Sequence, residues 1–396
     1  MQQQTHNNFP LRPAWIEIDL GRTRRNLQLI RQRLSRHVKL LAVVKDDAYG
    51  HGATEIARVA LEEGAWGLGL SSVEEAAPLR EAGITAPLVI HGERHESEFE
   101  YCVAKNLTVC VNEPHNVHAL ARVAGRANKR VPVHLKVNTG MSRYGVRWDE
   151  AASLVEKIIA EKSLELEGVM THFAQSDELD KTFANLQLER FHEVLRALEH
   201  AKVPVKLRHT CNSGGFLDLP HAHLDMVRTG ILLHGILPST ACQKLAGIES
   251  VMTVKTRIAA MQKLKHGEVA GYGMHYTADG QRRLAVLPIG YGDGFPRIRN
   301  VGHVLIHGRR APIVGGVTMD AFFVDVTDIP EAKMWDEAVV MGWQGAEEIN
   351  ARDIAGWKNG GTYEILTNWR IRLRKEVVNA INANSKKHTR TETMMA

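Results

Sequence analysis

The chain has 396 residues, of which 44% are hydrophobic and 24% are charged. This length suffices for two domains with their own cores, and four cysteines without C-x-x-C spacing exclude a disulfide scaffold. No stretch approaches the roughly 20 consecutive apolar residues of a membrane span, and the N-terminal residues lack the apolar core of a secretory signal. We therefore expect a cytoplasmic enzyme rather than a membrane, fibrous or secreted disulfide-rich protein.

The formal net charge is +5, from 50 lysines and arginines against 45 acidic residues. Binding of nucleic acid would require the basic residues to cluster. The densest basic runs lie near the C-terminus, at residues 370–375 and 386–390, and no nucleic-acid-binding motif accompanies them. We interpret these runs as a solvated last element and a tail. Neither a nucleic-acid partner nor a membrane partner is expected.

Between residues 39 and 228, short apolar runs alternate with amphipathic stretches of helical periodicity. Each run is bounded by polar residues or by glycine and proline, which is typical of a buried parallel strand. Eight such runs predict a TIM (β/α)8 barrel, because a doubly wound sheet, the competing fold, does not need eight strands. The runs occupy residues 39–45, 66–70, 88–91, 108–111, 132–138, 168–172, 205–210 and 225–228.

The pattern changes near residue 245, after which β-rich runs are separated by glycine-containing turns. We therefore predict an α/β protein with an N-terminal TIM barrel at 12–245 and a mostly-β C-terminal domain at 246–383. A disordered basic tail is predicted at 384–396. The strand-like segment 14–20 precedes the first barrel run, and the sequence alone does not decide which domain it joins.

The residues that follow the barrel strands are candidates for chemistry, because barrel enzymes carry their sites at the C-terminal strand ends. The first run ends in Lys45, Arg143 follows the fifth, His172 ends the sixth, and Arg228 ends the eighth. Small-residue loops follow the last two runs, one of them with Ser213, where barrels commonly bind phosphate. A lysine beside a phosphate site suggests pyridoxal phosphate, bound as a Schiff base.

Each of these residues alone has a simpler interpretation. Lys45 could be a surface lysine whose aliphatic stem lies on the barrel, and Ser213 could cap a helix. His172 could be a hydrogen-bonded core histidine. The His-Ala-His at 221–223 has no acidic or histidine partners at matching strand ends, so no metal site is predicted.

The segment AVVKDDAYGHG at 42–52 resembles the pyridoxal-phosphate lysine signature of the alanine racemase family. The resemblance continues, in family order, to residue 366. The matching segments are HLKVNTGMSRYGV, THFAQSDE, NSGG, DMVRTGI, GYGMHY, IGYGDGFPR, GGVTMD and GTYEIL. It implies a homodimeric racemase that interconverts L- and D-alanine with pyridoxal phosphate, shares its active site between subunits and supplies D-alanine for peptidoglycan.

The resemblance also implies roles for individual residues. Lys45 would hold the cofactor and act as the base on one face of the substrate, and Tyr272 of the second subunit would act on the other. His172 would contact that tyrosine, Arg228 would face the pyridine nitrogen, and Arg143 would contact the phenolic oxygen and the substrate. Met319 and Tyr291 would lie around the substrate, and Lys136 matches a lysine that is often carbamylated in this family. The matches around the cofactor and its phosphate are Tyr49, Asn212, Ser213, Gly230, Ile231 and Tyr363.

The chain departs from the family pattern directly after Lys45. Asp46 and Asp47 stand where Ala-Asn is usual, and a negative charge from Asp47 close to Lys45 would raise the lysine pKa.

A decarboxylase of basic amino acids would have an acidic residue in place of Arg228 and a cysteine in the second domain, but no cysteine follows Cys242. A cofactor-carrying protein of the single-barrel type would lack the β domain that holds Tyr272.

Overall fold

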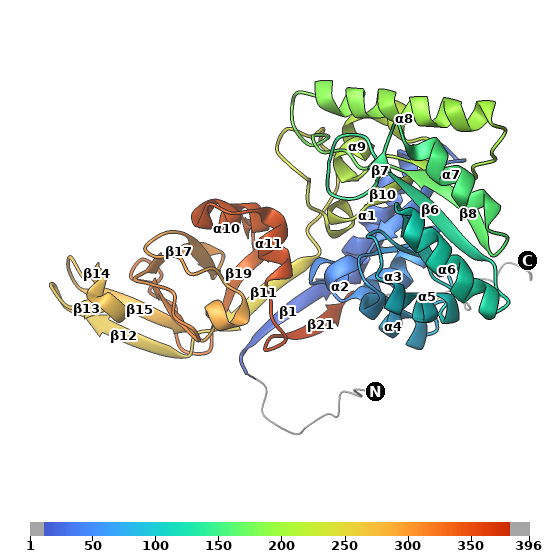
Figure 1. Cartoon of the computed structure of the whole chain (residues 1–396). Coiled ribbons are helices and arrows are strands. Elements are labelled where there is room, and N and C mark those ends of the chain that lie inside the picture. The colour runs from blue at the N-terminus through green and yellow to red at the C-terminus, as the bar shows by residue number, and fades with distance from the viewer. Residues whose placement is uncertain (1–11, 381–396) are drawn as a thin grey trace, which may run out of the picture. The chain divides into compact units, whose positions relative to one another are not determined.

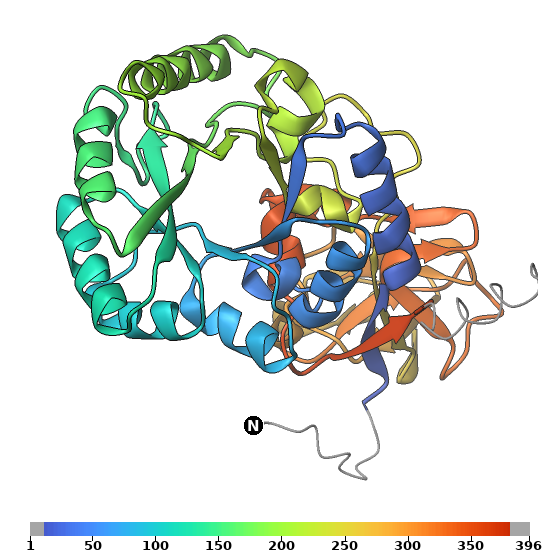
Figure 2. The same ribbon diagram turned by 90° about the vertical axis from the view of Figure 1, so that its right-hand side faces the viewer.

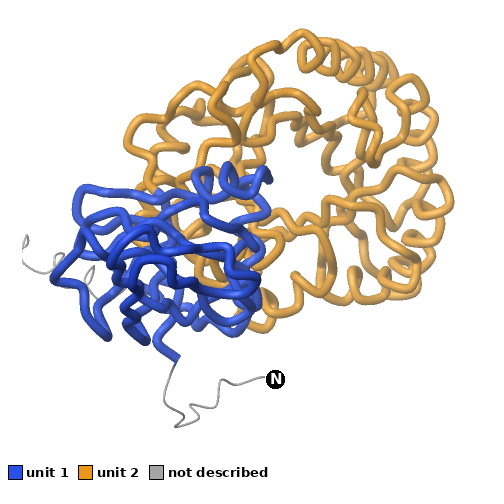
Figure 3. Tube along the Cα trace, turned by 90° about the vertical axis from the view of Figure 1, so that its left-hand side faces the viewer, with its two compact units in different colours: residues 1–19, 250–396 blue, residues 20–249 orange. Residues whose placement is uncertain are grey.

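The computed structural model describes residues 12–380, so the predicted tail at 384–396 lies outside the described residues. The chain forms two compact units, one of residues 20–249 and one of residues 1–19 together with 250–396 (Figure 3). The first unit alternates strands and helices, and the second is mostly β (Figure 1).

The first unit is a parallel barrel whose eight strands each overlap one of the eight predicted runs, so the predicted barrel is confirmed. Its order is β10-β2-β3-β4-β5-β6-β8-β9. Two backbone hydrogen bonds bring the outer strands together, Asp225 N to Arg208 O at 3.0 Å and Arg228 N to Cys211 O at 2.9 Å. The strands are β2 (Lys39–Val43), β3 (Gly67–Leu70), β4 (Leu88–Ile90), β5 (Thr108–Val111), β6 (Val131–Asn138), β8 (Leu164–Met170), β9 (Leu207–His209) and β10 (Met226–Thr229), with a short β7 (Val146–Arg147) beside β6.

Helices surround the barrel strands (Figure 2). The helix over 182–200 buries Phe191, Val194 and Leu198 at helical spacing, so its apolar stripe faces inward. Inside, six strands each contribute one residue to a common apolar cluster: Leu41, Val89, Cys110, Met170, Leu207 and Met226. The helices are α1 (Leu20–Gln32), α2 (Lys45–Tyr49), α3 (Ala53–Glu62), α4 (Val73–Glu81), α5 (Phe99–Ala104), α6 (Pro114–Arg126), α7 (Ala151–Ala160), α8 (Thr182–His200) and α9 (Ser213–Asp218), with short 3₁₀ turns η1 (Glu96–Glu98), η2 (Pro220–Ala222) and η3 (Ile231–His234).

The second unit is built on a sheet of order β12-β15-β18-β17-β16-β19-β11-β1-β21, which confirms a mostly-β C-terminal domain. Its helices are α10 (Ala351–Lys358) and α11 (Thr362–Thr367). Its strands are β1 (Ala14–Asp19), β11 (Met252–Arg257), β12 (Ala260–Leu264), β13 (Val269–Ala270), β14 (Tyr276–Thr277), β15 (Arg282–Leu287), β16 (His303–Ile306), β17 (Arg309–Val314), β18 (Phe322–Asp325), β19 (Glu337–Gln344), β20 (Glu347–Ile349) and β21 (Arg374–Val378), with 3₁₀ turns η4 (Tyr272–Met274) and η5 (Tyr291–Asp293).

Strand β1 shows where the predicted domain boundary differs from the structure. It pairs antiparallel with β11, Trp15 opposite Lys255, and parallel with β21, Trp15 opposite Arg374. The backbone of 14–19 is thus satisfied by the second unit, although the predicted boundary of 12–245 placed it with the barrel. In the part of the chain that the structure describes, no helix is long and apolar enough to cross a bilayer.

Candidate active site

Lys45 begins a left-handed turn at the end of β2. The four following residues, 46–49, all have φ between 51° and 55°, a conformation that costs roughly 1–2 kcal/mol per residue and that aspartate tolerates better than most. Hydrogen bonds hold the turn, including Asp46 N to Glu75 Oε1 at 2.8 Å and Gly52 N to Asp47 O at 2.9 Å. Strain of this kind persists only where the surroundings enforce it, which is typical of functional sites.

The two aspartates of this turn have different surroundings. Asp47 Oδ1 accepts a hydrogen bond from Ala53 N at 2.7 Å, at the start of α3. The charges that raise the pKa of Lys45 are those of Glu75 and Asp46. The rise in pKa that was expected from Asp47 therefore comes from Asp46 instead. Burial is the larger influence, and together with Arg143 it leaves the pKa of Lys45 below its usual value.

The barrel mouth gathers positive charge. Lys136 is 5% exposed, and its Nζ donates to His91 O at 2.9 Å. Burial lowers its pKa to about 8, and the charges of Arg228, Arg143 and Lys45 act in the same direction. Within residues 12–380, none of these four cations forms an ion pair with a carboxylate. Such a cluster is suited to an anionic ligand.

Arg228 is buried in this mouth and its guanidinium is fixed on several sides. It donates to Thr171 O at 2.7 Å, to Thr210 O at 2.9 Å, to His209 Nδ1 at 3.0 Å and to His172 Nδ1 at 3.3 Å. Burial lowers its pKa to about 10, so it remains charged at neutral pH. Because arginine only donates, the hydrogen of a neutral His172 lies on Nε2. Burial and Arg228 keep the pKa of His172 well below its usual value.

A tight corner forms where the loops after β9 and β10 meet. Gly230 N donates to Ser213 Oγ at 3.2 Å. A Cβ at Gly230 would lie 2.3 Å from Tyr49 Oη, so a larger residue there would have to displace the Tyr49 ring. Asn212, not Ser213, caps α9, since its Oδ1 accepts from Gly215 N at 2.9 Å. The hydrogen bond to Ser213 and the close contact with the Tyr49 ring bring these two residues to Gly230, with Asn212 and Ile231 next to them in the chain.

The other predicted site residues lie in the second unit. Tyr272, Tyr291 and Met319 line one pocket of about 630 Å³. Tyr272 is 83% exposed, on a turn between Gly271 at φ 76° and Gly273 at φ 71°. Tyr363 lies on α11 and does not line this pocket.

Two family models match the chain, "Alanine racemase, N-terminal domain" over residues 18–238 and "Alanine racemase, C-terminal domain" over residues 251–377. The chain belongs to the alanine racemase family. It is 39% identical over 371 residues to an alanine racemase of Halothermothrix orenii, covering 93% of this chain and 98% of that protein. An alanine racemase of Carboxydothermus hydrogenoformans is 40% identical over 92% of this chain and 99% of its own length. A solved alanine racemase of Clostridium difficile superposes with a TM-score of 0.89 at 31% identity, covering 93% of this chain and 97% of that one.

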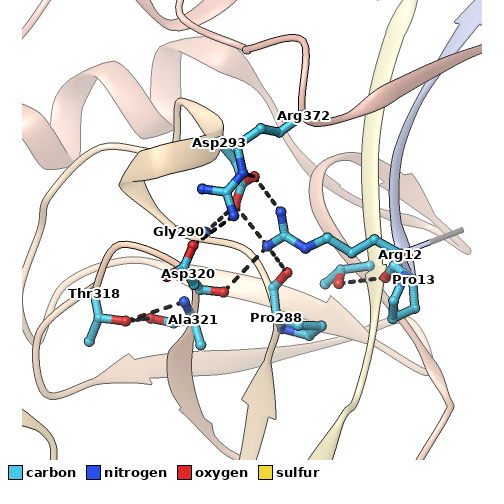
Figure 4. A network of polar contacts seen from close by, with 10 residues as sticks. Arg12, Pro13, Pro288, Gly290, Asp293, Thr318, Asp320, Ala321 and Arg372 are labelled. Atoms are coloured by element: carbon cyan, nitrogen blue, oxygen red, sulfur yellow. Dashed lines mark hydrogen bonds and ion pairs between the residues drawn. The ribbon is translucent and has the colours of Figure 1, made fainter.

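The structure of this member of the alanine racemase family also contains an ion pair with a buried carboxylate that the sequence analysis did not identify. The carboxylate of Asp293, which is fully buried, accepts from Arg12 NH2 at 2.9 Å and from Gly290 N at 2.9 Å (Figure 4). Arg12 also donates to Pro288 O, and Arg372 donates to Asp320 Oδ1 at 2.6 Å. Asp293 lies within the matched segment IGYGDGFPR, but no periodicity indicates that Arg12 reaches it.

Proposed function

We propose that the protein is an alanine racemase that interconverts L- and D-alanine with pyridoxal phosphate held in the barrel mouth. The proposal rests on the surroundings of Lys45. It stands on a strained, hydrogen-bonded turn, its pKa is lowered by burial, and Lys136, Arg143 and Arg228 provide positive charge around it. Membership of the alanine racemase family supports the same reaction.

The residues present fit the cofactor. When bound, pyridoxal phosphate supplies an aldehyde carbon for the amine of Lys45 and an electron-withdrawing ring that acidifies the substrate Cα–H. Tyr49, Ser213 and Gly230 would hold its phosphate, and family resemblance assigns Ile231 and Tyr363 to the phosphate and Asn212 to the cofactor. Arg143 would contact its phenolic oxygen.

Arg228 would face the ring nitrogen. Since it stays charged at neutral pH, it offers that nitrogen a hydrogen bond and not a proton. A ring nitrogen without a proton withdraws electrons less strongly, which suits a racemase that limits side reactions. A decarboxylase of basic amino acids would need an acidic residue in this place, and Arg228 contacts carbonyl oxygens and histidines instead.

Racemisation needs two bases, because a proton removed from one face of Cα must be replaced on the other. Lys45 Nζ serves one face, and its lowered pKa favours the neutral amine that accepts a proton. Tyr272 of the second subunit would serve the other, and by family resemblance His172 would contact it. We propose a homodimer in which each barrel mouth receives the exposed Tyr272 of the second subunit.

The remaining assignments concern the substrate. The main-chain N–H of Met319 and the guanidinium of Arg143 would bind the alanine carboxylate, and Tyr291 would line the entrance. A carbamylated Lys136 would carry a negative charge that orients Arg143. The product D-alanine would serve peptidoglycan synthesis in the cytoplasm.

Two variants test this assignment. After borohydride reduction of the loaded protein, peptide mass mapping should find the cofactor attached to residue 45 and find no attachment at that site in Lys45→Ala. Tyr272→Phe should bind the cofactor and lose racemisation. Cofactor attached elsewhere in the wild type, or wild-type turnover in Tyr272→Phe, would overturn the assignment. Release of carbon dioxide from lysine, ornithine or diaminopimelate would favour the decarboxylase.

A further inference from the structure

A chain of buried polar side chains leads away from Arg228 through the barrel interior. Arg228 NH1 lies 3.0 Å from His209 Nδ1, and His209 Nε2 lies 3.0 Å from His134 Nδ1. His134 Nε2 lies 3.1 Å from Oε2 of Glu167. Both histidines are fully buried, whereas the side chain of Glu167 is 20% exposed. The four residues come from β10, β9, β6 and β8.

Every hydrogen bond in this chain runs from Arg228 toward Glu167, because a guanidinium at one end only donates and a carboxylate at the other end only accepts. A guanidinium only donates, so Nδ1 of His209 accepts and carries no hydrogen. His209 therefore holds its hydrogen on Nε2 and donates to Nδ1 of His134. His134 in turn holds its hydrogen on Nε2 and donates to the carboxylate of Glu167. Burial, with the charge of Arg228, keeps the pKa of His209 well below its usual value, so a neutral imidazole is expected there.

Glu167 also provides a negative charge that is linked to the buried guanidinium of Arg228. Arg228 is 3% exposed and, among residues 12–380, contacts no carboxylate. A buried charge without a counter-charge is costly. Glu167 is the carboxylate to which the two imidazoles connect it, and hydrogen bonds linked in one direction polarise one another.

The strand pairing is modified where this chain passes. Val133 pairs with Leu166 and His134 with Gly168, which leaves Glu167 as an extra residue on β8. A bulge of this kind re-aims a side chain, and bulges are frequent next to active sites. A Cβ at Gly168 would lie 2.9 Å from the ring of His134, so glycine makes room for the imidazole. Bulge and glycine together accommodate the contact between His134 and Glu167.

We propose that Glu167 is a positioning residue for the racemase reaction: through His134 and His209 it fixes the tautomer that holds the guanidinium of Arg228 in place. The inference rests on the proposed function for the role of Arg228. Glu167 itself does not act at the cofactor. It lines a surface pocket of about 450 Å³ with Thr108 and Pro132, residues at the N-terminal ends of β5 and β6, opposite the strand ends that carry Lys45.

The first test measures the tautomers directly in the full-length, cofactor-loaded protein. Long-range ¹H–¹⁵N correlation spectra of protein labelled at histidine should show both His209 and His134 neutral, with the hydrogen on Nε2. Glu167→Leu removes the acceptor, so the His134 signals should change and those of His209 should follow. Either histidine with its hydrogen on Nδ1, or doubly protonated, in the wild type would overturn the proposal. This measurement does not require racemisation, so the proposed function can fail without affecting it.

The second test measures function with a matched control. Glu165→Gln alters a neighbouring glutamate of β8 that forms a surface ion pair with Lys206. Glu167→Leu should lower kcat about tenfold with KM for alanine nearly unchanged, and should shift the absorption of the bound cofactor. Glu167→Gln, which keeps an acceptor oxygen, should recover most of both, and Glu165→Gln should match the wild type. If Glu167→Leu behaves like Glu165→Gln in kcat and absorption, Glu167 is not a positioning residue.

Discussion

The guanidinium of Arg12 lies against the buried carboxylate of Asp293, with Arg12 NH2 at 2.9 Å from Oδ2 (Figure 4). This pair fastens the turn that carries Tyr291, and the turn is itself tied to the neighbouring loop by Tyr291 N to Thr318 O at 3.1 Å and Gly292 N to Met319 O at 2.9 Å. A residue from the start of the described chain thereby fixes the relative positions of Tyr291 and Met319.

Removing the charge of Asp293 should therefore affect both stability and substrate binding. Asp293→Asn removes the buried carboxylate that faces Arg12 and Arg372, whose side chains are partly exposed, and loss of such charged hydrogen bonds costs about 1.5–3 kcal/mol. We expect a lower free energy of unfolding in urea and a severalfold higher KM for alanine, with cofactor absorption unchanged. Asp320→Asn, at an ion pair with a 62% exposed carboxylate, is the control and should cost below about 1 kcal/mol. Equal effects from the two variants would contradict this account.

Replacing Asp46 and replacing Asp47 should have different effects on the pKa of Lys45. Asp46 raises the pKa of Lys45, so Asp46→Asn should lower that pKa further and increase the neutral fraction of the amine. We expect cofactor-free protein of this variant to capture pyridoxal phosphate severalfold faster at pH 7, followed by absorbance.

Asp47→Asn is the matched comparison for this experiment. Asp47 accepts from Ala53 N at the start of α3, so the variant should leave the capture rate unchanged. Loss of a helix-capping acceptor costs about 1 kcal/mol, and less where asparagine replaces it. A faster capture in Asp47→Asn than in Asp46→Asn would show that the wrong aspartate has been assigned.

The sequence predicts most of the barrel but only part of its interior chemistry. Apolar runs between polar boundaries identify all eight barrel strands, because buried parallel strands have this composition whatever their neighbours. The link from His134 to Glu167 depends on a bulge, which shifts the register by one residue and leaves no mark in the apolar pattern. Segment 14–20 reads as a strand, but its partners β11 and β21 lie far along the chain, so its domain could not be derived.

The sequence likewise predicts some features of the candidate site and not others. Lys45, Arg143, His172 and Arg228 follow from the rule that barrel chemistry lies at strand ends. The different tasks of Asp46 and Asp47 do not, since they depend on the left-handed backbone of 46–49. Backbone of that hand is set by the hydrogen bonds around it, which residue types alone do not reveal.

Glu93 should make stability fall as pH rises. Burial raises its pKa from 4.5 to about 7, despite a hydrogen bond from Asn116 Nδ2 at 2.6 Å. Because the folded pKa is the higher one, the stabilising contribution is complete below pH 4.5 and is lost as pH rises through 7. Glu93→Gln should therefore be more stable than the wild type at pH 8, by up to about 3 kcal/mol, and similar to it at pH 4.

Thermal or urea unfolding at the two pH values measures this difference. Glu100→Gln, at a glutamate whose side chain is 79% exposed, is the control and should change the free energy of unfolding by less than about 0.5 kcal/mol. A constant difference between Glu93→Gln and the wild type across this range would mean that folding does not raise the pKa of Glu93.

Lys136 should react with carbon dioxide in a pH-dependent way. Carbamylation requires the neutral amine, and burial lowers the pKa of Lys136 to about 8. With ¹³C-bicarbonate, a carbamate signal should therefore grow as pH rises from 7 to 9 and be absent in Lys136→Ala. The partly buried Lys129, whose Nζ donates to Val103 O at 2.8 Å, serves as an internal control through Lys129→Ala, which should keep the signal. A signal that is lost in Lys129→Ala but kept in Lys136→Ala would contradict the assignment.

The most direct measurement of the central claim incubates the full-length protein with pyridoxal phosphate and L-alanine in D₂O. Loss of the Cα–H signal is followed by NMR, and the enantiomer ratio by chiral chromatography. Equal amounts of L- and D-alanine, with deuterium at Cα, are expected, because two bases on opposite faces exchange with solvent. Exchange without inversion would contradict the role of Tyr272, and the absence of exchange in protein that has bound the cofactor would contradict alanine racemisation itself.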